Sequence, residues 1–134
     1  MSYLLLLAHL IGDYVLQSHV MATRKTSSWR WAFIHAAFYS LPFAALLAWL
    51  GAPLDAAALA LAIIGSTHAV IDRLRLAARW CQWYGVGHPG LWTSPAGFEA
   101  PPPFLGVWLT IIVDNTLHLA INGAAFALLA PAAL

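Results

Sequence analysis

The chain has 134 residues, of which 62% are hydrophobic and only 8% are charged, and its formal net charge is +1. A soluble domain carries about 25% charged residues, so this composition excludes a soluble enzyme and a disordered segment. The small net charge excludes a surface that collects nucleic acids, and the single cysteine, Cys81, allows no internal disulfide. With a mean hydropathy of +0.77, the sequence predicts an all-α integral membrane protein.

Four stretches are long and apolar enough to cross a bilayer, which takes about 20 residues. The first covers roughly residues 2–21, and because no basic residue precedes its apolar run, it is predicted to be a retained helix rather than a signal peptide. The others cover roughly residues 29–50, 55–76 and 104–129. We therefore expect a four-helix transmembrane bundle, with residues 1–134 forming one integral membrane domain.

The basic residues predict the orientation of this bundle. The short middle connection, residues 51–55, has no Lys or Arg, and neither has either terminus. The six basic residues lie in or beside the first and third connections: Arg24, Lys25, Arg30, Arg73, Arg75 and Arg79. Because cytoplasmic loops carry the excess of Lys and Arg, we expect these two connections in the cytoplasm and both termini on the opposite side of the membrane.

The third connection, roughly residues 77–103, differs in composition from the predicted helices. It is rich in Gly and Pro, which predicts an irregular loop. Its Trp and Tyr side chains are typical of the membrane–water interface. The GVGHPG run within it lacks the spacing and the Lys of a phosphate-binding loop. We expect this loop to be an interfacial connector between the third and fourth helices, and the alternative is a lid that lies on the bilayer.

Polar residues interrupt all four apolar stretches. They are His9, Asp13, Gln17, His35, His68, Asp72, Asp114, His118 and Asn122. One Asp at the centre of a membrane helix costs roughly 2.5–3.5 kcal/mol on insertion scales. The apolar neighbours offset this cost for insertion, but they cannot satisfy the carboxylates in the folded protein. Partners for these groups must therefore come from within the bundle.

The spacing of these residues predicts how they meet. Three predicted helices carry a His and an Asp four residues apart, in the pairs His9–Asp13, His68–Asp72 and Asp114–His118. Residues four apart lie on one face of a helix. Gln17 extends the first stripe, and His35 stands on the remaining helix. Counted from the cytoplasmic end, all these groups fall roughly 7–20 Å deep, which predicts one shared polar layer.

Imidazoles and carboxylates that converge in this way are a ligand set for a divalent metal. The sequence favours zinc, with manganese or iron as alternatives. The expected ligands are His9, Asp13, His68, Asp114 and His118, with Asp72 and His35 as further ligands or supports of the ligands. Gln17, Lys25 and Asn115 are expected to contact a substrate or to orient the ligands. The sequence assigns no residue a catalytic role.

Several functions are compatible with this layer. Metal-dependent hydrolysis of a lipid or lipid-linked substrate, entering from the cytoplasmic leaflet, is the leading hypothesis. The first alternative is a non-enzymatic protein that has a structural metal and binds a membrane partner. The others are an ion or proton pathway and simple hydrogen-bonded contacts between helices. Besides the lipid bilayer, a second copy of the chain is a candidate partner.

The run HLIGDYVLQSHVMATRK, residues 9–25, resembles the opening signature of a family of small polytopic membrane proteins of unknown function. That family occurs in bacteria and bacteriophages, and its signature has His-x-x-x-Asp-aromatic, then Gln, Met-Ala and Lys. Further shared features are His35, the His68–Asp72 pair, and Asp114 with His118. Asn115 stands where members often have Gln. The resemblance implies no established activity, although the His–Asp helices look loosely like those of bacterial membrane-bound metal-dependent hydrolases.

Overall fold

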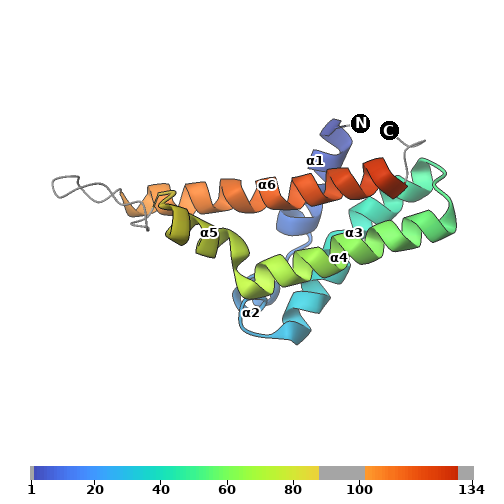
Figure 1. The fold of residues 1–134 in the computed structure, drawn as a ribbon. Coiled ribbons are helices and arrows are strands. Elements are labelled where there is room, and N and C mark those ends of the chain that lie inside the picture. Colours follow the sequence, from blue (N-terminus) through green and yellow to red (C-terminus); the bar gives the residue numbers. More distant parts are fainter. Residues whose placement is uncertain (1, 88–101, 130–134) are drawn as a thin grey trace. The chain divides into compact units, whose positions relative to one another are not determined.

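The computed structural model describes residues 2–87 and 102–129, and throughout these ranges it contains helices and no strand (Figure 1). This confirms the predicted all-α fold. The elements are α1 (Ser2–Leu10), a π-helical segment η1 (Ile11–Val15), α2 (His19–Arg24), α3 (Trp29–Trp49), α4 (Leu54–Leu74), α5 (Leu76–Tyr84) and α6 (Pro103–Leu129).

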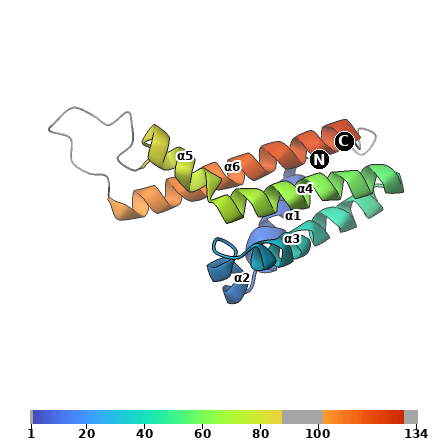
Figure 2. The same ribbon diagram turned by 60° about the horizontal axis from the view of Figure 1, so that its bottom comes forward.

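The chain forms two compact units. The first comprises residues 1–74 and 118–134, and the second comprises residues 75–117, so that α6 contributes to both. In the first unit, α3 and α4 lie side by side, as Figures 1 and 2 both show. They are joined by a short turn in which Gly51 has a positive φ of 66°, a conformation that favours glycine. α3 also contacts α1, η1 and α2.

An apolar cluster fills one end of the first unit. Each of four helices contributes to it, through Leu5 of α1, Phe43 of α3, Ile64 of α4 and Phe126 of α6, all of them buried. The turn between α3 and α4 packs against the same cluster through Leu50. The beginning of α1, the end of α6 and this turn therefore lie at the same end of the unit.

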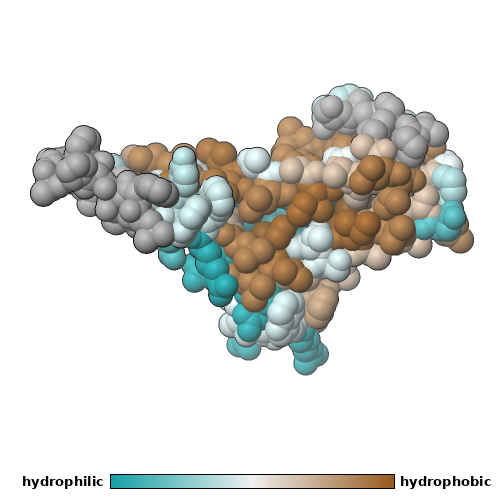
Figure 3. Space-filling model, in the orientation of Figure 1, coloured by the Kyte–Doolittle hydropathy of each residue, from teal (hydrophilic) through white to brown (hydrophobic). Residues whose placement is uncertain are grey.

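Within residues 2–87 and 102–129, three helices are long and apolar enough to cross a membrane: α3 and α4, with 21 residues each, and α6, with 27. They agree with three of the four predicted spans and indicate a membrane protein. Figure 3 shows that hydrophobic side chains cover much of the face it presents, while hydrophilic ones lie in separate patches, one around α2 and the beginning of α3 and another over α5.

The prediction of one unbroken helix over residues 2–21 is wrong. The apolar helix covers only Tyr3–Val15, about 20 Å at 1.5 Å per residue, and its last part is π-helical. A new helix, α2, begins after Ser18, whose extended backbone (φ −74°, ψ 159°) and hydroxyl cap it: Oγ accepts the backbone N–H of Met21 at 3.3 Å. Hydropathy does not register a capping side chain, and a prediction based on it therefore gives one continuous helix across Ser18.

The expectation of an irregular loop over residues 77–103 is wrong for its beginning. Residues 76–84, the run LAARWCQWY, form α5. Arg75, which has a left-handed backbone (φ 53°), precedes the helix as its N-cap, and Gly85 (φ 90°) follows it as its C-cap and donates its N–H to the carbonyl oxygen of Cys81 at 2.8 Å. The Gly and Pro residues on which the prediction rested come only after this helix. Residues 88–101 of the expected loop lie outside the described residues.

Candidate metal centre

Four buried side chains from three elements of the first unit converge on one point. They are Asp13 of η1, His35 of α3, and His68 and Asp72 of α4, and we call them the Asp–His tetrad. One ligand atom from each lies within 4.8 Å of all the others. Nε2 of His35 lies 3.0 Å from Oδ1 of Asp13, and Nε2 of His68 lies 3.1 Å from Oδ2 of Asp72. Such a group could bind a metal ion.

The π-helical segment brings Asp13 into this group. Its neighbour Gly12 packs on the backbone of α3 so closely that a Cβ at this position would lie 2.6 Å from the carbonyl oxygen of Tyr39. Only glycine fits there without displacing the segment. π-helical turns are rare and occur frequently at functional sites. On α4, a regular α-helix is enough to bring His68 and Asp72 together, because residues four apart lie on one helical face, as predicted.

Lys25 contacts three of the four members of the tetrad. Its Nζ lies 2.9 Å from Oδ2 of Asp72, 3.3 Å from Oδ1 of Asp13 and 3.2 Å from Nε2 of His35. Burial acts to lower the pKa of Lys25, but the carboxylates of Asp72 and Asp13 outweigh it and raise the pKa above the ordinary lysine value. The ammonium group is therefore charged. It offsets one of the two carboxylate charges.

The turn that carries Lys25 is held against the end of α4. Nη1 of Arg73 donates a hydrogen bond to the carbonyl oxygen of Thr26 at 3.0 Å, and its guanidinium lies 5.5 Å from the ring centre of Trp29. Since Arg73 directly follows Asp72, these contacts keep the Lys25 turn beside the tetrad.

A second polar group adjoins the tetrad on the side of the apolar cluster. It comprises His9, Tyr39, His118 and Asn122, which are all nearly inaccessible to solvent; we call it the Tyr39 group. Nδ2 of Asn122 donates to the hydroxyl oxygen of Tyr39 at 2.6 Å, and Nδ1 of His9 lies 2.9 Å from the same oxygen. Because the Tyr39 oxygen accepts from Asn122, its own hydrogen can be donated to His9. The hydroxyl thus ties α1 and α6 to α3.

The donor atoms of the tetrad fit a divalent cation. Two imidazole nitrogens and two carboxylate oxygens are the ligand types of zinc, manganese and iron sites. Among the residues that the structure describes, Nδ1 of His68 has no hydrogen-bond partner, and Nε2 lies 3.1 Å from Oδ2 of Asp72. A buried imidazole nitrogen with an unused lone pair is a natural metal ligand.

The structure places the predicted site residues in different surroundings. Asp72 and His35, expected as further ligands or supports, stand in the tetrad with Asp13 and His68, whereas His9 and His118 belong to the adjoining Tyr39 group. Gln17 is half-buried in the link between η1 and α2, and Asp114 and Asn115 are half-buried on the part of α6 that belongs to the second unit.

Sequence reasoning assigned no role to Tyr39. Its ring lies parallel to that of His68, with centroids 3.6 Å apart and an interplanar angle of 13°. The signal that could have found it is its position one helical turn after His35, on the face of α3 that turns toward the other polar residues.

A family model matches residues 1–122 of the chain, and its description is a protein of unknown function, DUF3307. The chain belongs to the DUF3307 family. The matched range includes every residue of the tetrad and of the Tyr39 group. Membership confirms the resemblance at the level of a family without an assigned function. None of the curated proteins and none of the solved structures matched this DUF3307 chain.

Proposed function

We propose that this DUF3307 protein is a membrane protein whose Asp–His tetrad binds a divalent metal ion. The observation that carries the proposal is the convergence of four buried ligand atoms within 4.8 Å of one another, on segments far apart in the sequence. Zinc is the leading candidate because it accepts both nitrogen and oxygen ligands, and its catalytic sites keep one coordination position for water. Manganese and iron are the alternatives.

The proposed orientation places the tetrad toward the cytoplasmic face of a bacterial inner membrane. It is supported by the positive-inside rule and by Lys25 and Arg73, which lie at the tetrad end of the first unit. The apolar cluster occupies the other end, together with the beginning of α1 and the end of α6. Both termini then lie on the outer side, and α1 with η1 crosses only part of the bilayer thickness.

In this proposal the metal serves the hydrolysis of a lipid or lipid-linked substrate. A bound divalent metal supplies hydroxide at neutral pH by lowering the pKa of its water. Lys25 supports the substrate class: its side chain is 13% exposed beside the tetrad, and an ammonium group binds phosphate well. Asp13, Asp72 and the two imidazoles would supply the ligands, with one coordination position left for water, and Lys25 would orient the phosphate of a lipid headgroup.

A second function is favoured by the same lysine. Lys25 already supplies a cation at 2.9 Å from Asp72 and 3.3 Å from Asp13, so the tetrad can also be read as a buried ion-pair network that only fastens the helices. A metal ion and the ammonium group compete for the same carboxylates. The metal reading therefore predicts bound metal in the parent protein, whereas the ion-pair reading predicts none while Lys25 occupies the carboxylates.

Metal content tests the first part of the proposal. The protein is purified in detergent under metal-replete conditions and analysed for zinc, manganese and iron. We expect one metal ion per chain in the parent protein, and a metal content at least tenfold lower in Asp13→Asn. Asp55→Asn is the matched control, because Asp55 is exposed at the beginning of α4, and it should retain the metal. Equal metal content in both variants would overturn the site.

A turnover assay tests the second part. Phospholipids and lipid-linked phosphate esters are incubated with the metal-loaded protein, and released headgroup or phosphate is measured. We expect release that stops with a chelator and in Asp72→Asn but continues in Asp55→Asn. Stoichiometric metal without release from any of these substrates would support a structural metal in a protein that binds a membrane partner.

A further inference from the structure

The second unit contains an apolar groove between α5 and the first part of α6. The two helices approach closely at one place, where a Cβ on Gly87 would lie 2.9 Å from the Cα of Gly106. Further along, they leave a groove of about 710 Å³, lined by Trp80 and Trp83 of α5 and Leu117 of α6 among others. Its volume is in the range of small-molecule binding sites.

Three aromatic side chains stand together on the exposed face of α5. The rings of Trp80 and Tyr84 are nearly parallel, with centroids 5.8 Å apart, and the ring of Trp83 lies 5.3 Å from that of Trp80. All three are about half exposed. Trp and Tyr are enriched where the hydrocarbon of a bilayer meets its polar headgroups. The aromatic side chains of α5 are therefore typical of a helix at the membrane interface.

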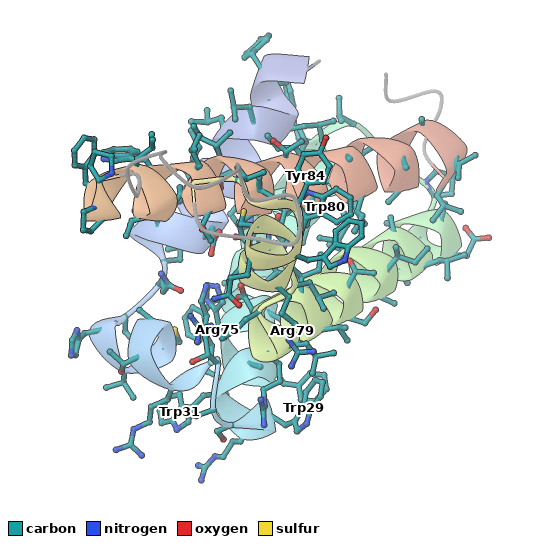
Figure 4. All side chains as sticks on the ribbon, turned by 60° about the vertical axis from the view of Figure 1, so that its left-hand side comes forward. Trp29, Trp31, Arg75, Arg79, Trp80 and Tyr84 are labelled. Carbon is teal, nitrogen blue, oxygen red and sulfur yellow. The ribbon has the colours of Figure 1, made fainter. Side chains whose placement is uncertain are left out.

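Arginine lies at the same groove. Arg79 is part of the lining, and Arg75 precedes it by one turn. Figure 4 shows Arg75 and Arg79 close together in the lower part of the view, and Trp80 and Tyr84 together above them. The sequence has no acidic residue between Asp72 and Glu99, so no carboxylate on α5 competes for these guanidinium groups.

We propose that the groove binds one anionic phospholipid, with an acyl chain against Trp80, Trp83 and Leu117 and the headgroup phosphate on Arg79. A guanidinium group matches a phosphate with two parallel hydrogen bonds. A basic helix with Trp on its apolar side is typical of segments that lie in an anionic membrane surface. This site goes beyond the proposed metal function and does not depend on it.

A partner helix fits the groove less well than an acyl chain does. Helices that pack together in membranes use small residues at their interfaces so that the backbones can approach. The walls of this groove carry bulky side chains instead, such as Trp80, Trp83 and Leu117. A flexible acyl chain can pass between bulky side chains, and its headgroup accounts for the arginine.

Native mass spectrometry of the full chain tests the proposal. The protein is released from detergent after incubation with phosphatidylglycerol or with phosphatidylcholine, and the retained lipid is counted. We expect one phosphatidylglycerol per chain, retained at least fivefold better than phosphatidylcholine. Arg79→Gln should reduce this preference about fivefold, the effect of one basic residue at an anionic surface. Arg24→Gln, which removes the same charge from an exposed site on α2, should leave it unchanged.

The other outcomes overturn the proposal. Equal retention of the two lipids would show that the bound lipid is boundary lipid, held without selectivity for its headgroup. A preference that falls equally in Arg79→Gln and Arg24→Gln would show a general charge effect, and chain dimers that exclude lipid would assign the groove to a second copy. Val113→Phe, which narrows the groove without changing its charge, supplies an independent arm: it should reduce the retention of phosphatidylglycerol, and unchanged retention would contradict the site.

Discussion

Tyr39 lies face to face with His68, with ring centroids 3.6 Å apart, and so connects the two polar groups of the first unit. Its ring covers one face of a tetrad imidazole, while its hydroxyl is bonded to Asn122 of α6 and His9 of α1. A single side chain of α3 thus fixes the orientation of His68 and the positions of two other helices.

Replacement of Tyr39 by Phe should keep the stacking on His68 but leave the polar atoms of His9 and Asn122 without their shared partner. Loss of a buried hydrogen-bond partner costs about 1–3 kcal/mol, which should appear as a lower midpoint of thermal unfolding in detergent. Tyr3→Phe is the control, because Tyr3 is largely exposed, and it should change the free energy of unfolding by less than about 0.5 kcal/mol. Equal effects of the two changes would contradict a role for the hydroxyl.

Gly12 and Gly123 should respond in opposite ways to alanine. A Cβ at Gly12 would lie 2.6 Å from the Tyr39 carbonyl, whereas a Cβ at Gly123 would meet nothing within 4 Å. Gly12→Ala should therefore displace η1, destabilise the protein by about 1–3 kcal/mol and weaken metal binding through Asp13. Gly123→Ala, inside α6, should stabilise it by roughly 0.5–1 kcal/mol. Thermal unfolding of both variants checks the sign, and a neutral Gly12→Ala would refute the close approach.

Removal of the Lys25 charge should affect the metal-free and metal-loaded protein differently. Without metal, Lys25→Met leaves the carboxylates of Asp13 and Asp72 uncompensated, which costs about 3–5 kcal/mol for a buried pair. With zinc, the competing ammonium group is gone, so zinc affinity should rise. Titration with zinc, followed by thermal unfolding, measures both effects, and Arg24→Met is the control. A fall in zinc affinity would instead assign Lys25 a supporting role in the site.

Arg75 has a left-handed backbone, with a φ of 53°. This conformation costs a residue with a side chain roughly 1–2 kcal/mol, but costs glycine little. Arg75→Gly should therefore stabilise the protein by about 1 kcal/mol, while Arg79→Gly, inside α5, should destabilise it by about the same amount. Both variants lose one positive charge, so the net charge of the protein is the same in the two. If thermal unfolding shows the same sign for both, the left-handed turn is wrong.

The sequence predicted the parts of this structure that depend on helical periodicity. His68 and Asp72 meet because residues four apart share a helix face, and α3, α4 and α6 are long apolar runs with few interruptions. The rise per residue along each helix also places Asp13 and His35 at about the same depth in the membrane as His68, although the three residues lie on separate helices. These inferences need only the rise and twist of a helix, together with the cost of burying charge in lipid.

The parts that were missed depend on local geometry and tertiary contacts. The break at Ser18 arises from one capping hydroxyl in an apolar run, and the π-helical turn depends on the close packing of Gly12 on Tyr39. Neither changes the average hydropathy. Likewise, the division of the polar residues between the tetrad and the Tyr39 group follows from the way α1 and α6 pack on α3, which helix periodicity does not determine.

X-ray absorption of the zinc-loaded protein in detergent tests the central claim most directly, because it reports the atoms bound to the metal. The account predicts one zinc per chain with only nitrogen and oxygen neighbours at about 2.0–2.2 Å, including the scattering pattern of two imidazoles, which should fall to one in His68→Gln. Zinc bound through sulfur, or a spectrum that His68→Gln leaves unchanged, would contradict it.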